Sequence, residues 1–299
     1  MHAASTFFDA STGLGPYAEF GFVFPSYRRR NGAEVRRVPT ARATIYFARD
    51  VVLSPGAPPM SGMFCEGPHS RGFSVDSECG EIVGVKVAPG ALRALLGAPA
   101  RDLRDRTIAL EELWGASATE LGERMLASRS QRERRGLLVR ALAGRSRAHE
   151  RHDRVALAIA RIIDKRSGLV TVRELCELSG YGHRALLQRF DDWVGLTPKQ
   201  YARLARLRAA IAHLGAREPA SWADFAVARG YWDQAHMIHE FTALVGVPPA
   251  AFRRELNRFS PEGALATGRE ALPPREQRIY RALGMVAGWV APKSTIERR

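Results

Sequence analysis

Side chains that can read nucleic acid bases occur at helical spacing in two segments of the chain's C-terminal third. In the first segment, about 183–193, Arg184, Leu187 and Gln188 fall on one face of an expected helix. Guanidinium, amide and imidazole groups reach base edges in the major groove, where a bidentate pair contributes about 1–3 kcal/mol of discrimination. In the second segment, about 233–244, the corresponding candidates are Gln234, Ala235, His236, Ile238 and His239.

Basic side chains near these segments are candidates for contacts to phosphates, which position a protein on a duplex without reading its sequence. The formal net charge of +14 favours polyanionic partners in general. The alternative is that these are ordinary solvated side chains of amphipathic helices. The phosphate-contacting candidates are Arg189, Lys199, Arg203 and Arg253.

Local signals predict the helices that carry the first set. Thr171 followed by Glu174 is a capping box that begins a short helix, which ends at Ser179-Gly180. The next helix begins at about His183 and stops at Gly195. Two helices with so short a gap are typical of a helix-turn-helix unit.

The same outline recurs about 50 residues later, with one extra residue in the second turn. Between the two copies, residues 201–211 predict a connecting helix with Leu204, Leu207 and Ile211 inward and arginines outward. Such a helix would let two recognition helices enter successive major-groove turns, about 34 Å apart. The matched pairs are Thr171 and Ser221, Gly180 and Gly230, Tyr181 and Tyr231, Phe190 and Phe241, Gly195 and Gly246, Pro198 and Pro249, and Tyr201 and Phe252.

The first 100 residues have a different texture, rich in Gly and Pro, with β-type runs at 43–47 and 82–87. They predict a small β barrel or sandwich. Trailing helices are expected at 91–96, 108–126 and 133–142, and the small, charged stretch 143–148 is the predicted linker. The fold class is therefore α+β: a β-rich domain over 1–148, an all-α domain of two helix-turn-helix units over 149–258, and a tail over 259–299 with a helix at 275–290.

Three cysteines, Cys65, Cys79 and Cys176, do not form a disulfide framework. Cys65, His69 and Cys79, with Glu66, match no compact zinc spacing, so no metal is expected, while a redox role for Cys65 and Cys79 stays open. The sequence has no secretory signal and no window near the about 20 apolar residues that cross a bilayer, so a cytoplasmic location is expected, without a membrane partner. No catalytic or cofactor motif is evident, and neither an enzyme nor a cofactor is predicted.

Residues 153–257 closely resemble the DNA-binding domain of the AraC family of bacterial transcription regulators. The stretches that carry the resemblance are 230–241, 245–249 and the linker-helix segment 206–210. It implies two helix-turn-helix units on asymmetric DNA sites. Gln188 and His239 stand where many members carry Arg, so the target sequence does not transfer.

A weaker resemblance covers roughly 15–145, through residues 82–92 and 110–113, to the domain that precedes this DNA-binding part in some members. It implies a domain that binds an effector or dimerises. Expected partners are double-stranded DNA, a small-molecule effector and RNA polymerase, with monomer and homodimer both open. The rival interpretation is a DNA repair or modification enzyme that docks through the helices. The aromatic residues considered for an effector pocket, or else for ordinary core, are Tyr17, Phe20, Phe22, Phe24, Tyr46 and Phe47.

Overall fold

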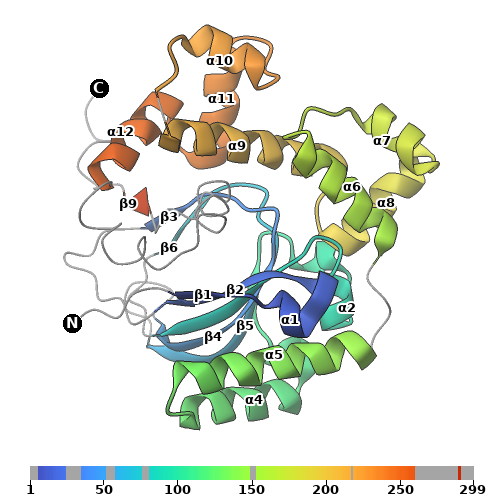
Figure 1. Cartoon of the computed structure of the whole chain (residues 1–299), viewed down its shortest axis with the longest axis vertical. Coiled ribbons are helices and arrows are strands. Elements are labelled where there is room, and N and C mark those ends of the chain that lie inside the picture. The colour runs from blue at the N-terminus through green and yellow to red at the C-terminus, as the bar shows by residue number, and fades with distance from the viewer. Residues whose placement is uncertain are drawn as a thin grey trace.

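The computed structural model describes residues 6–24, 35–51, 58–75, 81–148, 153–216, 218–259 and 289–290. Its N-terminal part is built on a six-stranded antiparallel sheet with strand order β1-β2-β7-β4-β5-β8 (Figure 1). A smaller three-stranded sheet has the order β6-β3-β9. The strands are β1 (Thr6–Phe8), β2 (Ala18–Phe24), β3 (Val35–Arg37), β4 (Thr44–Val51), β5 (Met60–Glu66), β6 (Phe73–Val75), β7 (Ile82–Val87), β8 (Thr107–Ala109) and β9 (Trp289–Val290).

Alternating side chains of the large sheet explain why helices cover one of its faces. Ile45, Phe47, Val83 and Val85 point into one core, which α4 and α5 close from below in the view of Figure 1. The aromatic set considered for a pocket is divided: Phe47 lies in this core, whereas Tyr46 packs on the opposite face of the sheet. The helices of this part are α1 (Ser11–Leu14), η1 (Gly15–Tyr17), α2 (Leu92–Leu96), η2 (Ala100–Leu103), α3 (Glu111–Trp114), α4 (Ala116–Ala127) and α5 (Gln131–Ala148).

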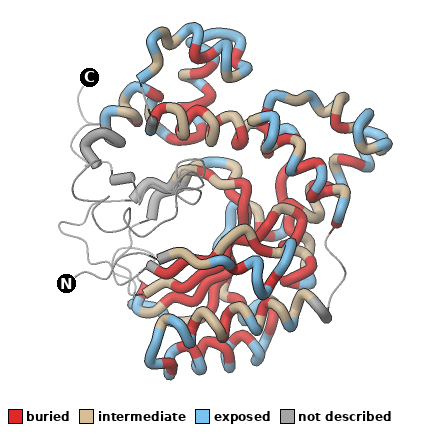
Figure 2. Tube along the Cα trace, in the orientation of Figure 1, coloured by how far each residue is buried: buried red, intermediate tan, exposed pale blue. Residues whose placement is uncertain are grey.

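The C-terminal part is all helical and has its own core. In Figure 1 the long helix α9 runs between α6 to α8 on one side and α10 with α11 on the other. Figure 2 shows that buried and exposed residues alternate along the described parts of these helices, and the buried ones form a common core. The helices are α6 (Arg154–Lys165), α7 (Val172–Ser179), α8 (His183–Val194), α9 (Pro198–Ala216), α10 (Trp222–Ala228), α11 (Gln234–Val245) and α12 (Pro249–Phe259).

Three local predictions are wrong. The expected helix 108–126 begins instead with β8, because residues 107–109 pair with β5 at Cys65 and its neighbours. The expected linker 143–148 forms the last turns of α5. In the tail, residues 289–290 form β9, paired with β3, instead of ending a helix; the rest of the helix predicted at 275–290 lies outside the described residues.

Within the described ranges, no helix combines the length and the hydropathy needed to cross a bilayer.

Candidate nucleic-acid interface

The first helix-turn-helix unit consists of α7 and α8. The capping box predicted at the start of α7 is confirmed: the Thr171 hydroxyl accepts from the N–H of Glu174, and the Glu174 carboxylate accepts from the N–H of Thr171 (2.7 Å). Gly180 then ends the helix in the left-handed conformation, with φ of 72°. That conformation turns the chain directly into α8, which gives the unit its short gap.

Helix α8 buries one face and exposes the other. Leu186 and Phe190 lie fully inside the C-terminal core, as their spacing predicts. On the opposite face Arg184 and Gln188 are exposed, and Leu187 is half-buried. The three candidate base-reading residues of this helix therefore lie side by side on an accessible surface.

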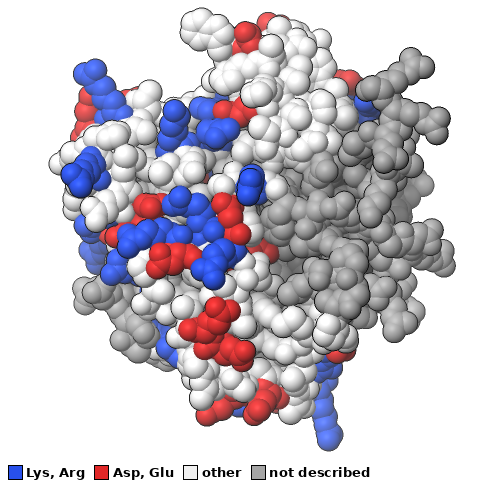
Figure 3. Space-filling model, turned by 180° about the vertical axis from the view of Figure 1, so that it is seen from behind, with Lys and Arg blue, Asp and Glu red and all other residues white. Residues whose placement is uncertain are grey.

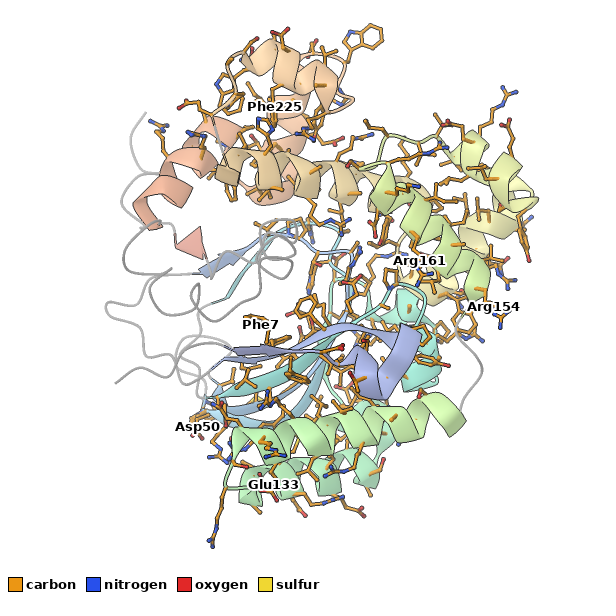
Figure 4. All side chains as sticks on the ribbon, viewed as in Figure 1. Phe7, Asp50, Glu133, Arg154, Arg161 and Phe225 are labelled. Carbon is orange, nitrogen blue, oxygen red and sulfur yellow. The ribbon has the colours of Figure 1, made fainter. Side chains whose placement is uncertain are left out.

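The second unit repeats this arrangement with α10 and α11. Asp233 caps α11, its carboxylate accepting from the N–H of His236 (2.7 Å). Met237, Phe241 and Leu244 are buried, and Phe225 of α10 lies among the side chains that hold the unit together (Figure 4). On the other side of α11, Gln234, Ala235, His236 and His239 are exposed and Ile238 is half-buried.

Matching aromatic pairs show that the repeat extends to packing. Phe190 of α8 meets Tyr201 of α9 with ring centroids 5.5 Å apart and planes at 90°. Phe241 of α11 meets Phe252 of α12 at the same 5.5 Å, with planes at 66°. Gly195 and Gly246, which follow the two recognition helices, both have left-handed φ values, 82° and 88°.

The connecting helix α9 holds the two units together and also contacts the second recognition helix. Leu204, Leu207 and Ile211 are buried, as predicted. Arg203 and Arg206 on its other side bind the carboxylate of Glu240 of α11, with N···O distances of 3.1 and 3.4 Å. The 19 residues of α9 span about 28 Å, which is close to one turn of duplex DNA.

The four candidate phosphate-contacting residues differ in their surroundings. Lys199 is exposed at the start of α9 and has no ion-pair partner among the described residues. Arg189 lies 2.6 Å from Asp153, Arg203 binds Glu240, and Arg253 lies 3.1 Å from Glu218. Figure 3 shows the same character on one face of the molecule, where basic and acidic side chains alternate in a central patch. Acidic neighbours therefore offset much of the local positive charge.

The C-terminal end of α8 is held by arginines of the N-terminal part, in a contact that we call the α8 clamp: Arg93, Arg101 and Arg104 against α8 and Gly195. Arg104 Nε donates to the carbonyl oxygen of Gly195 (2.6 Å), and its guanidinium pairs with Asp191. Arg101 pairs with Asp192, and Arg93 lies over the ring of Trp193, 5.1 Å from its centroid. Asp191, which the helical spacing places on the same face as Arg184 and Gln188, therefore contacts the N-terminal part.

A second contact between the two parts is the Arg42 cluster, formed by Glu19, Arg42, Asp164, Tyr201 and Arg208. Arg42 is buried, and its guanidinium donates to Glu19 (2.9 Å), to Asp164 (2.6 Å) and to the hydroxyl of Tyr201. Arg208 also pairs with Asp164. Although burial raises the pKa of Asp164, the charges of Arg42 and Arg208 outweigh it and hold this pKa below its ordinary value.

Within the described residues, Cys65 and Cys176 are free cysteines. Cys65 is fully buried in β5, and burial raises the pKa of its thiol well above the ordinary value. His69 is buried nearby in sequence, with Nδ1 3.8 Å from Asp105. No group of three His, Cys, Asp or Glu side chains converges in the described ranges, and Cys79 lies outside them.

Comparison with known proteins agrees with this geometry. Residues 175–255, from α7 to α12, match the family model described as a helix-turn-helix domain. No curated protein matches the chain significantly.

Three solved structures illustrate the similarity. The C-terminal domain of AraT, a response regulator from Geobacillus stearothermophilus, is 20% identical, with a TM-score of 0.32 over 34% of this chain and 85% of that one. ToxT from Vibrio cholerae is 9% identical, with a TM-score of 0.41 over 84% and 98% of the two chains. Wild-type ToxT of strain SCE256, bound to an unsaturated fatty acid, is 13% identical, with a TM-score of 0.37 over 76% and 97%.

Proposed function

We propose that the chain, whose residues 175–255 match a helix-turn-helix domain, is a DNA-binding transcription regulator of the AraC type that binds one duplex site through both α8 and α11. The observation that carries this proposal is the pair of exposed recognition faces, each opposite a buried face and joined by α9. The length of α9 suits two adjacent major-groove turns on one side of the duplex. Such a protein acts where the chromosome is, which is the cytoplasm of a bacterium.

On this model, Arg184 and Gln188 read one half of the site. Arg pairs bidentately with guanine and Gln with adenine, because their donors and acceptors match those base edges. Leu187 lies between them, suited to a thymine methyl. Across α9, the second half is read by Gln234, Ala235, His236, Ile238 and His239.

Selection of genomic fragments with the full-length protein, at a fixed salt concentration, tests this model. We expect one motif with two half-elements about one helical turn apart. Arg184→Ala and Gln188→Ala should each relax one position of one half, at about 1–3 kcal/mol per lost base contact. Bound fragments without a common motif, with affinity that only falls with salt, would falsify the proposal.

Lys199 is proposed to contact a phosphate, since it is the exposed basic candidate for which the described part of the chain supplies no acidic partner. Lys199→Ala should weaken binding to the selected site and to unrelated duplexes by the same factor. On the selected site it should reduce the slope of log affinity against log salt by about one. Lys165→Ala, which removes an exposed lysine from the end of α6, is the control. An unchanged slope for Lys199→Ala would show that this side chain does not meet the backbone.

We further propose that the N-terminal part controls the DNA-binding part through the α8 clamp. Because the clamp binds the C-terminal end of α8, a shift of residues 93–104 would reorient the exposed face of this helix. The signal that would shift them is a small-molecule effector or contact with a second copy of the chain. RNA polymerase is the proposed partner for the output.

A further inference from the structure

Trp232 has an exposure that its chemistry does not favour. Its side chain is 88% exposed, the highest value among the large apolar side chains of the described residues. Tryptophan is highly buried on average, because removing the large apolar surface of the indole from water is favourable. Within the described ranges its only hydrogen bond is made by the backbone: the N–H donates to Nδ1 of His236 (3.2 Å).

The position of Trp232 puts the indole beside the expected path of DNA. It directly precedes Asp233, which caps α11, and the bond to His236 ties it to the first turn of that helix. In helix-turn-helix proteins the N-terminal residues of the recognition helix contact the base edges. Trp232 therefore lies at the end of α11 that we expect to approach the groove, two residues before Gln234.

The repeat identifies Trp232 as an addition to the second unit. Tyr181 matches Tyr231, and the cap of α8, Gly182, matches the cap of α11, Asp233. Trp232 is the extra residue between those positions and has no counterpart in the first unit. The second turn thus carries an exposed indole where the first turn carries nothing.

Helix α11 lacks the basic side chains that usually contact DNA, and Trp232 could supply a contact in their place. Residues 231–245 contain no Lys or Arg, whereas α8 contains Arg184 and Arg189. The acidic residues of the stretch, Asp233 and Glu240, are both engaged within the protein. The second unit therefore needs contacts that do not depend on its own positive charge.

Resting on the proposed function, we propose that Trp232 is a DNA contact of the second unit. The indole packs its flat face on a deoxyribose at the edge of the second half-site, and its Nε1–H donates to a phosphate oxygen. This contact anchors α11 so that Gln234 and His236 meet the bases. It is uncharged, so it adds affinity without adding to the salt dependence.

The test uses full-length protein and a labelled duplex that carries the selected site. Trp232→Ala should weaken binding about tenfold, which is about 1.4 kcal/mol, and Trp232→Phe should weaken it less, because the ring remains and the donor is lost. The slope of log affinity against log salt should match that of the wild type. Footprint protection should fade over the second half-site only.

Val227→Ala is the matched control, since Val227 is an exposed apolar side chain (63%) on α10 of the same unit. It should bind like the wild type. Thermal unfolding of each variant should be unchanged, because neither side chain packs in a core. Wild-type affinity for Trp232→Ala, or an equal loss for Val227→Ala, would overturn the proposal. Failure of the wild type itself to select a motif would instead count against the proposed function.

Discussion

Replacing Asp164 by Ala should lower the free energy of unfolding by about 3–5 kcal/mol, because it removes the closer of the two carboxylates that pair with the buried Arg42 guanidinium. Arg208 and the Tyr201 hydroxyl lose the same carboxylate. Urea denaturation of the full chain measures the change.

Glu177→Ala is the control for Asp164→Ala. Glu177 also pairs with an arginine, Arg173 at 3.0 Å, but both side chains are largely exposed (62% and 89%). Exposed pairs of this kind contribute well under about 1 kcal/mol. If the two variants lose similar amounts, the Arg42 cluster does not stabilise the contact between the two parts.

The pH dependence of stability should follow the same carboxylate. The pKa of Asp164 is lower in the folded protein than its ordinary value of 3.8, so the ionised form is favoured by folding. The resulting stability is fully present above pH 3.8 and is lost as the pH falls through the folded value. When the pH is lowered from 5 to 3, the free energy of unfolding of Asp164→Ala should therefore fall by less than that of the wild type.

Gly195→Ala should destabilise the protein more than any other glycine-to-alanine change at the ends of the first unit's helices. Its φ of 82° disfavours a side chain, and a Cβ would lie 2.7 Å from both the carbonyl oxygen of Ala100 and a side-chain carbon of Pro68. The left-handed conformation costs about 1–2 kcal/mol, and the collision adds about 1–3 kcal/mol. The collision is relieved when α8 moves away from residues 100–103.

Gly180→Ala carries only the cost of the left-handed conformation, so the difference between the two variants isolates the cost of the collision. Gly180 has a φ of 72°, and a Cβ there would meet nothing within 4 Å. We expect Gly195→Ala to exceed it by about 1–3 kcal/mol in urea unfolding, and only Gly195→Ala to speed amide hydrogen exchange in α8 and at 100–103. Equal losses in the two variants would mean that the N-terminal part does not restrain α8.

Local signals were sufficient for the helix-turn-helix units and insufficient for the contacts between the two parts. The capping box at Thr171, the glycine at 180 and the apolar spacing of α8 are all read within a few residues of sequence, and the structure confirms them. The pairing of Arg104 with Asp191 joins residues 87 positions apart. No periodicity indicates such a pair, because helical spacing places Asp191 only on the outward face of α8 and says nothing of what it meets there.

The errors in the N-terminal part have the same origin. Residues 107–109 continue into helical sequence, and only the vacant edge of β5 makes them a strand. Residues 143–148 are small and charged, which suggested a linker, yet they extend α5 as helix. Whether a segment joins the edge of a sheet, and where a helix ends, depends on contacts with segments that are distant in the sequence. Local sequence patterns do not indicate those contacts.

The α8 clamp would couple DNA binding to ligand binding by the N-terminal part. The clamp joins the N-terminal part to α8. The N-terminal part also contacts α11, where the N–H of Gly72 donates to the carbonyl oxygen of Leu244 (2.8 Å). If DNA at the first half-site shifts α8 against residues 93–104, any molecule bound to the N-terminal part senses that shift. By linkage, the factor by which such a molecule changes the affinity for DNA equals the factor by which DNA changes the affinity for the molecule. The coupling through the α8 clamp would therefore act with the same strength in both directions.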